Sequence, residues 1–175
     1  MFWVDLTDAL SGLTDELDRR QKFGEAQVLR LPSHIVLMAD LDRVEQMRCQ
    51  KDDYAPVLSP AGERLTRLLE EGPSFGIHLI IVFSGFKAMN NVLGGKKRID
   101  LFRHRIALQM SEVESLEFTG STGASRLQTD GPTPVCAFMV DVESEREVRF
   151  KPYSTEGEMR QQVAQIGSTV RQWRK

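Results

Sequence analysis

Several features that would define a specialised protein are absent from this 175-residue sequence. No apolar run approaches the ~20 residues that a membrane-spanning helix needs. The two cysteines, Cys49 and Cys136, lie far apart and outside any C-x-x-C pair, so we expect neither a disulfide nor a cysteine metal site. No G-x-x-x-x-G-K-S/T string occurs, and the nearest stretch, residues 94–97, lacks the first glycine and the final hydroxyl. The chain therefore carries no loop of the type that cradles a triphosphate.

Neither sign of charge is in large excess, since 23 Lys and Arg residues stand against 25 Asp and Glu residues, for a net charge of -2. A dedicated nucleic-acid binder is usually basic, so the composition does not favour that class. The N-terminal stretch lacks the basic region of a signal peptide. With the unpaired cysteines, these features predict a cytoplasmic protein. The 41% hydrophobic content suits one domain over residues 1–175.

Apolar spacing predicts the elements of the first half of the chain. Leucines at steps of three and four predict a helix over residues 6–20. The continuous apolar run over residues 35–38 predicts a strand that is buried on both faces. Ser59, followed by a proline, predicts the start of a second helix, which Gly72 ends.

The second half predicts four more strands, over residues 76–83, 104–110, 135–141 and 147–153, of which the last two form an edge hairpin. Ser111 and Glu114 form a capping box at the start of a short helix. A terminal amphipathic helix is predicted from an apolar stripe at steps of four and three: Met159, Val163, Ile166, Val170 and Trp173. The alternation of strands and helices predicts an α/β fold with a three-layer, mostly parallel sheet.

Asp40 is the first candidate for chemistry, because it ends the predicted strand that begins at His34. An acidic residue at the carboxyl end of a parallel strand points into the crevice where ligands bind. In P-loop enzymes an aspartate at this place holds Mg²⁺. The alternative is that Asp40 and Asp42 only cap the following turn. His78, inside the next apolar strand, is expected to be a core histidine.

The order of five phrases resembles the motor domain of FtsK/SpoIIIE translocases, whose relatives include the multi-domain ATPases of type VII secretion. The similarity runs from about residue 5 to about residue 153. The phrases are an E-x-x-R-R helix, a Walker B strand, a G-I-H-L phrase, an R-I-A-L strand and a serine-acidic turn. They correspond here to Asp15 to Arg20, His34 to Asp40, Gly76 to Leu79, Arg105 to Leu108, and Ser111 with Glu112.

The resemblance implies the C-terminal portion of a RecA-like P-loop NTPase core. ATP and Mg are the cofactors of that family, other FtsK-type ATPase subunits or domains are the partners, and DNA or a secreted protein is the cargo. Asp40 takes the Walker B position, where it would hold Mg, with Asp42 beside it, and Ser84 takes the sensor position. Arg103 and Arg105 lie where arginines could reach a neighbouring subunit's nucleotide, and the alternative is a solvated entry to a strand.

The departures from the family concern catalysis. Leu41 stands where the family has a glutamate, and the sensor strand ends in Phe83-Ser84-Gly85 in place of a Thr-Gln-Arg phrase. We therefore expect little or no ATP hydrolysis by this chain alone. It would be either the C-terminal piece of a longer protein, which could be membrane-anchored, with an upstream Walker A segment, or a degenerate module that regulates a ring of active motors.

A rival from another class is a non-catalytic Rossmann-like or flavodoxin-like binding domain. That interpretation would need a glycine-rich turn after the first strand, and the sequence has none.

Overall fold

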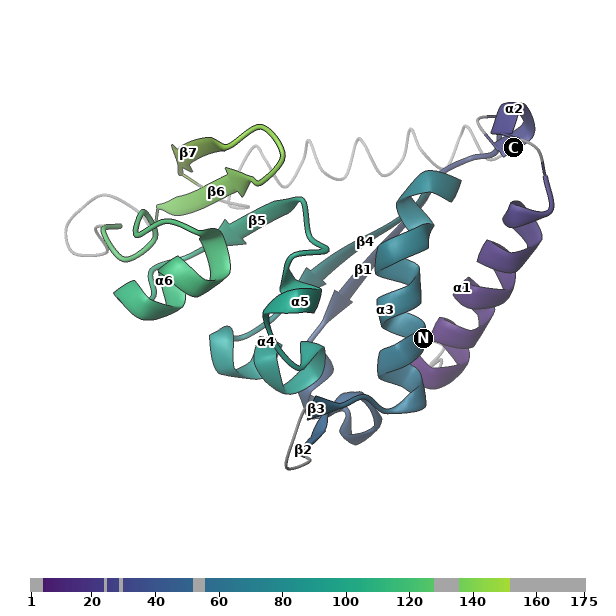
Figure 1. The fold of residues 1–175 in the computed structure, drawn as a ribbon, viewed down its shortest axis with the longest axis horizontal. Coiled ribbons are helices and arrows are strands. Elements are labelled where there is room, and N and C mark those ends of the chain that lie inside the picture. Colours follow the sequence, from purple (N-terminus) through teal and green to yellow (C-terminus); the bar gives the residue numbers. More distant parts are fainter. Residues whose placement is uncertain (1–4, 24, 29, 52–55, 128–135, 152–175) are drawn as a thin grey trace, which may run out of the picture. The chain divides into compact units, whose positions relative to one another are not determined.

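A computed structural model describes residues 5–23, 25–28, 30–51, 56–127 and 136–151 (Figure 1). The chain divides into two compact units, Met1–Arg103 and His104–Lys175, and each is considered by itself. One domain over residues 1–175 stays a prediction. In the part of the chain that the structure describes, no helix is long and apolar enough to cross a membrane.

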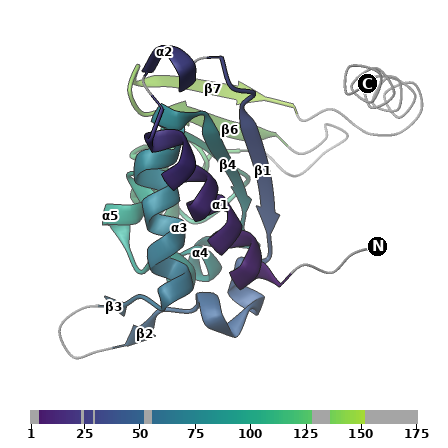
Figure 2. The same cartoon turned by 90° about the vertical axis from the view of Figure 1, so that its right-hand side faces the viewer.

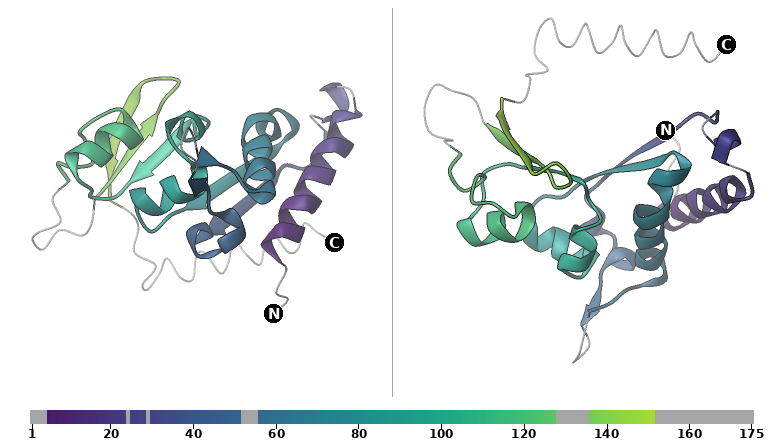
Figure 3. Two further views of the ribbon diagram at one scale, coloured as in Figure 1. Left: turned by 60° about the horizontal axis from the view of Figure 1, so that its bottom comes forward. Right: turned by 45° about the horizontal axis from the view of Figure 1, so that its top comes forward.

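The first unit combines helices with a parallel pair of strands. Its helical elements are α1 (Leu6–Gln21), α2 (Glu25–Val28), η1 (Leu41–Arg43), η2 (Glu45–Met47), α3 (Pro60–Glu71), η3 (Gly72–Phe75), α4 (Phe86–Leu93) and α5 (Lys96–Ile99). Its strands are β1 (His34–Ala39), β2 (Gln50–Lys51), β3 (Pro56–Val57) and β4 (Ile77–Val82). The short β2–β3 pair is antiparallel and can be followed in blue in Figure 3.

Local capping chemistry fixes where the two long helices begin. The Asp5 carboxylate accepts a hydrogen bond from the Thr7 backbone N–H at the start of α1. The Ser59 hydroxyl accepts one from the Gly62 backbone N–H at the start of α3, with Pro60 in the first helical position. Each side chain satisfies an amide that the helix leaves unpaired. The predicted starts of both helices are confirmed.

Strands β1 and β4 pair in parallel, with Ala39 opposite Val82 at their carboxyl ends. Helices α1 and α3 contact each other, α3 also contacts β4, and Figure 2 shows both helices on one side of the strand pair. The core beneath them is formed by buried apolar side chains, among them Leu10, Leu17, Met38, Leu65, Leu68 and Ile77. The packed helices thus bury one face of the pair.

The opposite face of the β1–β4 pair is apolar and open. Ile35 and Leu37 on β1 are 70% and 69% exposed, and Ile80 and Val82 on β4 are 52% exposed each. The prediction that residues 35–38 are buried on both faces is therefore wrong for this chain. His78 is exposed on the same face, so it is not the core histidine that its apolar neighbours suggested.

The second unit contains an antiparallel sheet with the order β5 (His104–Ala107), β6 (Ala137–Asp141) and β7 (Arg146–Phe150), and the helix α6 (Glu112–Thr119). The edge hairpin is confirmed, and so is the capping box, in which Ser111 and Glu114 exchange hydrogen bonds. The mixture of helices and strands agrees with the predicted α/β class. A three-layer, mostly parallel sheet is not confirmed by the described strands, because β5 also runs antiparallel to β6.

The core of the second unit lies on one face of this sheet, where α6 packs against β5 (Figure 3). Its buried apolar residues are Ala107, Ala124, Leu127, Phe138 and Val140. The predicted terminal helix, with its stripe from Met159 to Trp173, lies outside the described residues.

Candidate functional site

The carboxyl edge of the β1–β4 pair brings three of the candidate residues to one end of the strands. The backbone N–H of Asp40 donates to the Val82 carbonyl oxygen at 3.3 Å, which extends the parallel ladder by one residue. Ser84 follows β4 at the same edge and is exposed. Asp42 lies in η1, directly after Asp40. The carboxyl ends of parallel strands are where α/β folds bind ligands.

Asp40 adopts a left-handed backbone conformation, with φ of 55°. Its backbone carbonyl, and not its side chain, accepts the hydrogen bond from the Arg43 N–H at 3.0 Å that closes the turn. The side chain makes no capping hydrogen bond and the residue is exposed. The alternative interpretation, in which this carboxylate merely caps the turn, therefore has no support from the geometry.

Asp42 differs from Asp40 because it is half-buried. Its Oδ1 atom is buried and has no hydrogen-bond partner among the described residues. Its backbone carbonyl oxygen accepts from Nε of Arg48 at 2.9 Å. A buried carboxylate oxygen normally has a donor or a cation beside it, so this atom is an acceptor that a bound water or cation would satisfy.

Leu41 lies between the two aspartates, where the resemblance to FtsK/SpoIIIE motors would place a glutamate. It is only 2% exposed and points into the core of the first unit, where η1 contacts α4. The backbone therefore directs this position away from the open edge. The chain lacks the second carboxylate, and a carboxylate placed here would enter apolar surroundings.

The arginine candidates lie on either side of the boundary between the two units. Arg105 is buried, and its Nη1 donates to the Phe118 carbonyl oxygen at 2.8 Å, near the C-terminus of α6. This contact gives the Arg105 guanidinium a structural role in the second unit, which does not fit the proposed trans arginine. Arg103 is exposed, and its role toward a neighbouring subunit stays a prediction.

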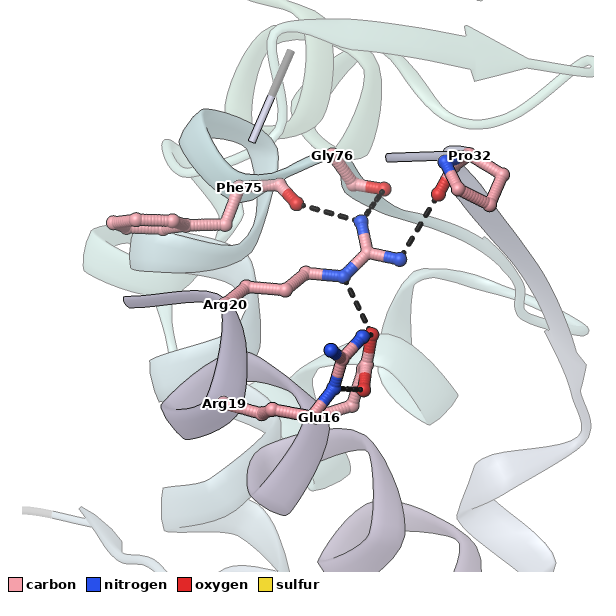
Figure 4. Close-up of polar contacts among 6 residues, drawn as sticks. All are labelled: Glu16, Arg19, Arg20, Pro32, Phe75 and Gly76. Carbon is pink, nitrogen blue, oxygen red and sulfur yellow. Dashed lines mark hydrogen bonds and ion pairs between the residues drawn. The ribbon is translucent and has the colours of Figure 1, made fainter. Parts of the chain in front are cut away.

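A buried arginine, which the sequence marked only as part of a phrase, holds together the segments at the amino ends of β1 and β4 (Figure 4). Arg20 is 1% exposed. Its Nη1 donates to the carbonyl oxygens of Phe75 at 2.8 Å and Gly76 at 3.5 Å, and its Nη2 donates to that of Pro32 at 2.9 Å. Its Nε pairs with Glu16 Oε1 at 2.7 Å. We call this group the Arg20 clasp.

The Arg20 clasp ties α1 to the segments that precede β1 and β4. A Cβ atom on Gly76 would lie 3.2 Å from Arg20 Nη1, and Gly76 has φ of 72°. Glycine is therefore favoured here both by the close approach of Arg20 and by the left-handed backbone. The sequence feature that could have indicated this clasp is the spacing of Glu16, Arg19 and Arg20. On a helix this spacing places both arginines within reach of one carboxylate.

Glu16 is the acidic centre of the clasp. Hydrogen bonds from Arg19, and then from Arg20, lower the pKa of this carboxyl from 4.5 to about 2. Arg19 also lies over the Phe23 ring, 5.3 Å from its centroid. Both guanidiniums thus favour the ionised form of Glu16.

The left-handed backbone of Asp40 sets the outcome of substitutions there. Asp40→Asn should be nearly neutral, because asparagine tolerates this conformation, whereas Asp40→Ala should cost about 1 kcal/mol. Asp40→Gly should be at least as stable as the alanine variant. Urea denaturation of the three variants provides the measurement. A glycine variant less stable than the alanine variant would show that backbone conformation does not govern this site.

The described residues define an α/β fold with two aspartates at the carboxyl edge of a parallel strand pair. No protein-family model matches the sequence, and no curated protein matches it either. Among solved structures, the cytoplasmic domain of the type VII secretion ATPase EccC from Thermomonospora curvata is similar in fold, with a TM-score of 0.57 and 20% sequence identity. The match covers 87% of this chain and 18% of that chain, so this chain spans less than a fifth of the length of that cytoplasmic domain. At this identity the likeness shows the fold alone.

Proposed function

We propose that this chain is an ATPase-like module of the FtsK/SpoIIIE class, either a later portion of a motor domain or a degenerate copy of one, and that it hydrolyses little or no ATP alone. The observation that carries the proposal is the edge formed by Asp40, Leu41 and Asp42. It keeps carboxylates that suit a metal, yet its middle position is buried in the core. The fold similarity to the EccC ATPase supports the class.

The donor set of this edge fits Mg²⁺ better than it fits a triphosphate. Mg²⁺ is usually bound through one or two carboxylates, with water and phosphate oxygens completing its shell. Asp40 and Asp42 could supply those carboxylates, and the unpartnered Asp42 Oδ1 is an acceptor in need of a donor or cation. The described residues contain no group of three or more His, Cys, Asp or Glu side chains that could hold a metal by itself. Bound Mg²⁺ would supply charge neutralisation for phosphate oxygens.

The open face of the β1–β4 pair supports the proposal that this chain is a portion of a larger ATPase domain. Parallel strands are normally covered on both faces, whereas Ile35, Leu37 and Ile80 are exposed here. A further layer from the remainder of an ATPase domain would bury them. The small share of the EccC chain that this chain matches agrees with that interpretation.

In this proposal the partners are other FtsK-type ATPase subunits or domains, with a secreted protein or DNA as cargo, in the cytoplasm. Arg103, which is exposed and directly precedes β5, is the arginine that would reach the nucleotide of a neighbouring subunit. Ser84 is the polar residue at the sensor position. Arg105 is omitted from this role because its guanidinium is buried.

Isothermal titration calorimetry of the chain with Mg-ATP tests the proposal. We expect weak binding or none, because two carboxylates and a metal cannot replace several backbone N–H contacts to the phosphates. Asp42→Asn provides the matched control, since it removes one acidic ligand and should abolish whatever Mg-dependent binding the parent shows. A dissociation constant near ~1 µM, about -8 kcal/mol, would contradict the proposal.

A further inference from the structure

The sheet of the second unit has apolar side chains on both of its faces, although the core lies on one of them. The strand register aligns Ile106, Met139 and Val148 in one row, on the face opposite to Phe138 and Val140. Ile106 is 57% exposed, and Leu108, directly after β5, is 55% exposed. We call this second face the outer face; its apolar strand residues are Ile106, Ala137, Met139, Val148 and Phe150, of which Ala137 is already buried, and Leu108 follows β5. A sheet that is apolar on two faces is suited to be covered on both.

We propose that the C-terminal segment of this chain, residues 155–173, covers the outer face as an amphipathic helix. This segment lies outside the described residues, and its sequence carries the apolar stripe from Met159 to Trp173 at steps of four and three. As a helix the stripe is ~21 Å long, and the five-residue strands β6 and β7 are each ~17 Å long. One helix, ~10 Å across, matches the ~10 Å width of three paired strands.

The C-terminal segment follows β7 closely in the chain, which places it within reach of the outer face. Strand β7 ends at Phe150, and Thr155 with Glu158 forms the capping box that predicts the helix start. The link of residues 151–154 can span up to ~13 Å, which is enough to step from the sheet to a layer ~10 Å above it. The helix would then run antiparallel to β7, back toward the turn between β6 and β7.

Charge favours the same direction. The turn between β6 and β7 and its flanks hold three acidic residues against one arginine: Asp141, Glu143 and Glu145, with Arg146. The end of the segment that reaches this turn is basic, with Arg171, Arg174 and Lys175, while its beginning carries two acidic residues, Glu156 and Glu158, against Arg160. The antiparallel arrangement therefore places opposite charges together, and the reverse arrangement would place like charges together.

Tryptophan fluorescence of the full chain tests the proposal. The chain has two tryptophans, Trp3 and Trp173, so Trp3→Phe leaves Trp173 as the reporter. We expect acrylamide to quench Trp173 several-fold less efficiently than it quenches a synthetic peptide of residues 152–175. Adding Ile106→Glu, which places a charge in the middle of the outer face, should raise the quenching to the peptide's level.

Two matched variants report on the other apolar surfaces. Ile35→Glu places the same charge on the open face of β1–β4, and Val113→Glu places it on α6, where Val113 is exposed. Neither substitution should increase the acrylamide quenching of Trp173. Release by Ile35→Glu without release by Ile106→Glu would overturn the proposal in favour of the β1–β4 face. A Trp173 that is as accessible as in the peptide, or is shielded only at concentrations where the chain dimerises, would also overturn it.

Binding in trans separates docking from loss of the fold. The peptide of residues 152–175 should bind a chain truncated after Ser154, as measured by fluorescence anisotropy, and Ile106→Glu in the truncated chain should weaken binding at least about tenfold. A peptide with Arg171→Gln and Arg174→Gln should bind more weakly at low salt and approach the parent peptide at high salt. Absence of binding to a truncated chain with unchanged circular dichroism would overturn the proposal.

Discussion

Arg20→Met should lower the free energy of unfolding of the first unit by about 3–5 kcal/mol, because breaking a buried pair and leaving carbonyl acceptors unpaired are both costly. Methionine keeps most of the length and apolar stem of arginine. The loss therefore reports on the guanidinium, which serves the carbonyl oxygens of Pro32, Phe75 and Gly76 at once. Glu16 would keep its other partner, Arg19, at 2.7 Å.

Thermal melts followed by circular dichroism should show this loss as a fall in Tm of roughly 10 °C. Arg19→Met is the matched control, since it removes the neighbouring guanidinium of the same carboxylate from an exposed position, and it should change Tm little. Arg20→Lys should fall between the two, because one ammonium cannot serve three carbonyls in different directions. Equal melting temperatures for Arg19→Met and Arg20→Met would rule out the clasp as a stabilising element.

The pKa of Glu16 gives the clasp a pH dependence of known sign. Because folding lowers this pKa from 4.5 to about 2, the ionised carboxylate contributes its full stabilisation above pH 4.5 and loses it as the pH falls toward 2. Glu16→Gln should therefore flatten the acid side of the stability curve between these values. An unchanged acid slope in Glu16→Gln would show that other carboxyls dominate acid unfolding.

The sequence predicted best the features that short-range chemistry determines. Ser59 and Ser111 each cap the helix that follows, and those contacts involve only neighbours a few residues away. Burial of β1 was predicted less well. An apolar run such as residues 35–38 is typical of a strand with a layer on each face, yet only the helix side is covered here, and the pattern cannot tell which layers the chain itself provides.

The sequence predicted which residues follow the two strands but not their conformation, and their role as a site stays a prediction. Asp40 and Ser84 do meet at one edge, because parallel pairing brings carboxyl ends together. The left-handed backbone of Asp40 and the inward direction of Leu41 depend on how η1 packs, which no local pattern records. Arg105 is buried by α6, a contact made across 13 positions in the sequence.

The Arg20 clasp also changes the meaning of the resemblance to FtsK/SpoIIIE motors. Two of the phrases that carry it, the one ending at Arg20 and the one beginning at Gly76, are joined by a direct hydrogen bond. These residues stabilise the fold at the amino end of the strands, whereas Asp40 lies beyond their carboxyl ends. The phrases therefore argue for the fold, and catalysis has to be judged at Asp40, Leu41 and Asp42.

Leu41→Glu, which would create an acidic pair of the kind found in FtsK/SpoIIIE Walker B strands, should destabilise the chain and should not create ATPase activity. The Leu41 side chain is 2% exposed. Removing its apolar contacts and burying a carboxylate with no partner should together cost about 3–5 kcal/mol. If the fold instead relaxed to bring the introduced carboxylate to the edge, the position of η1 against α4 would have to change.

The matched control for this substitution is Leu41→Met, which keeps the volume and should cost less than about 1.5 kcal/mol. Urea denaturation of both variants and phosphate release with Mg-ATP are the two measurements. We expect a large stability loss only for the glutamate variant and no phosphate release above the parent's level for either. A stable Leu41→Glu chain that hydrolyses ATP would show that the missing glutamate alone inactivates the edge. The expected result would instead attribute the proposed lack of activity to two causes: a backbone that turns position 41 inward, and the lack of a phosphate-binding loop in the sequence.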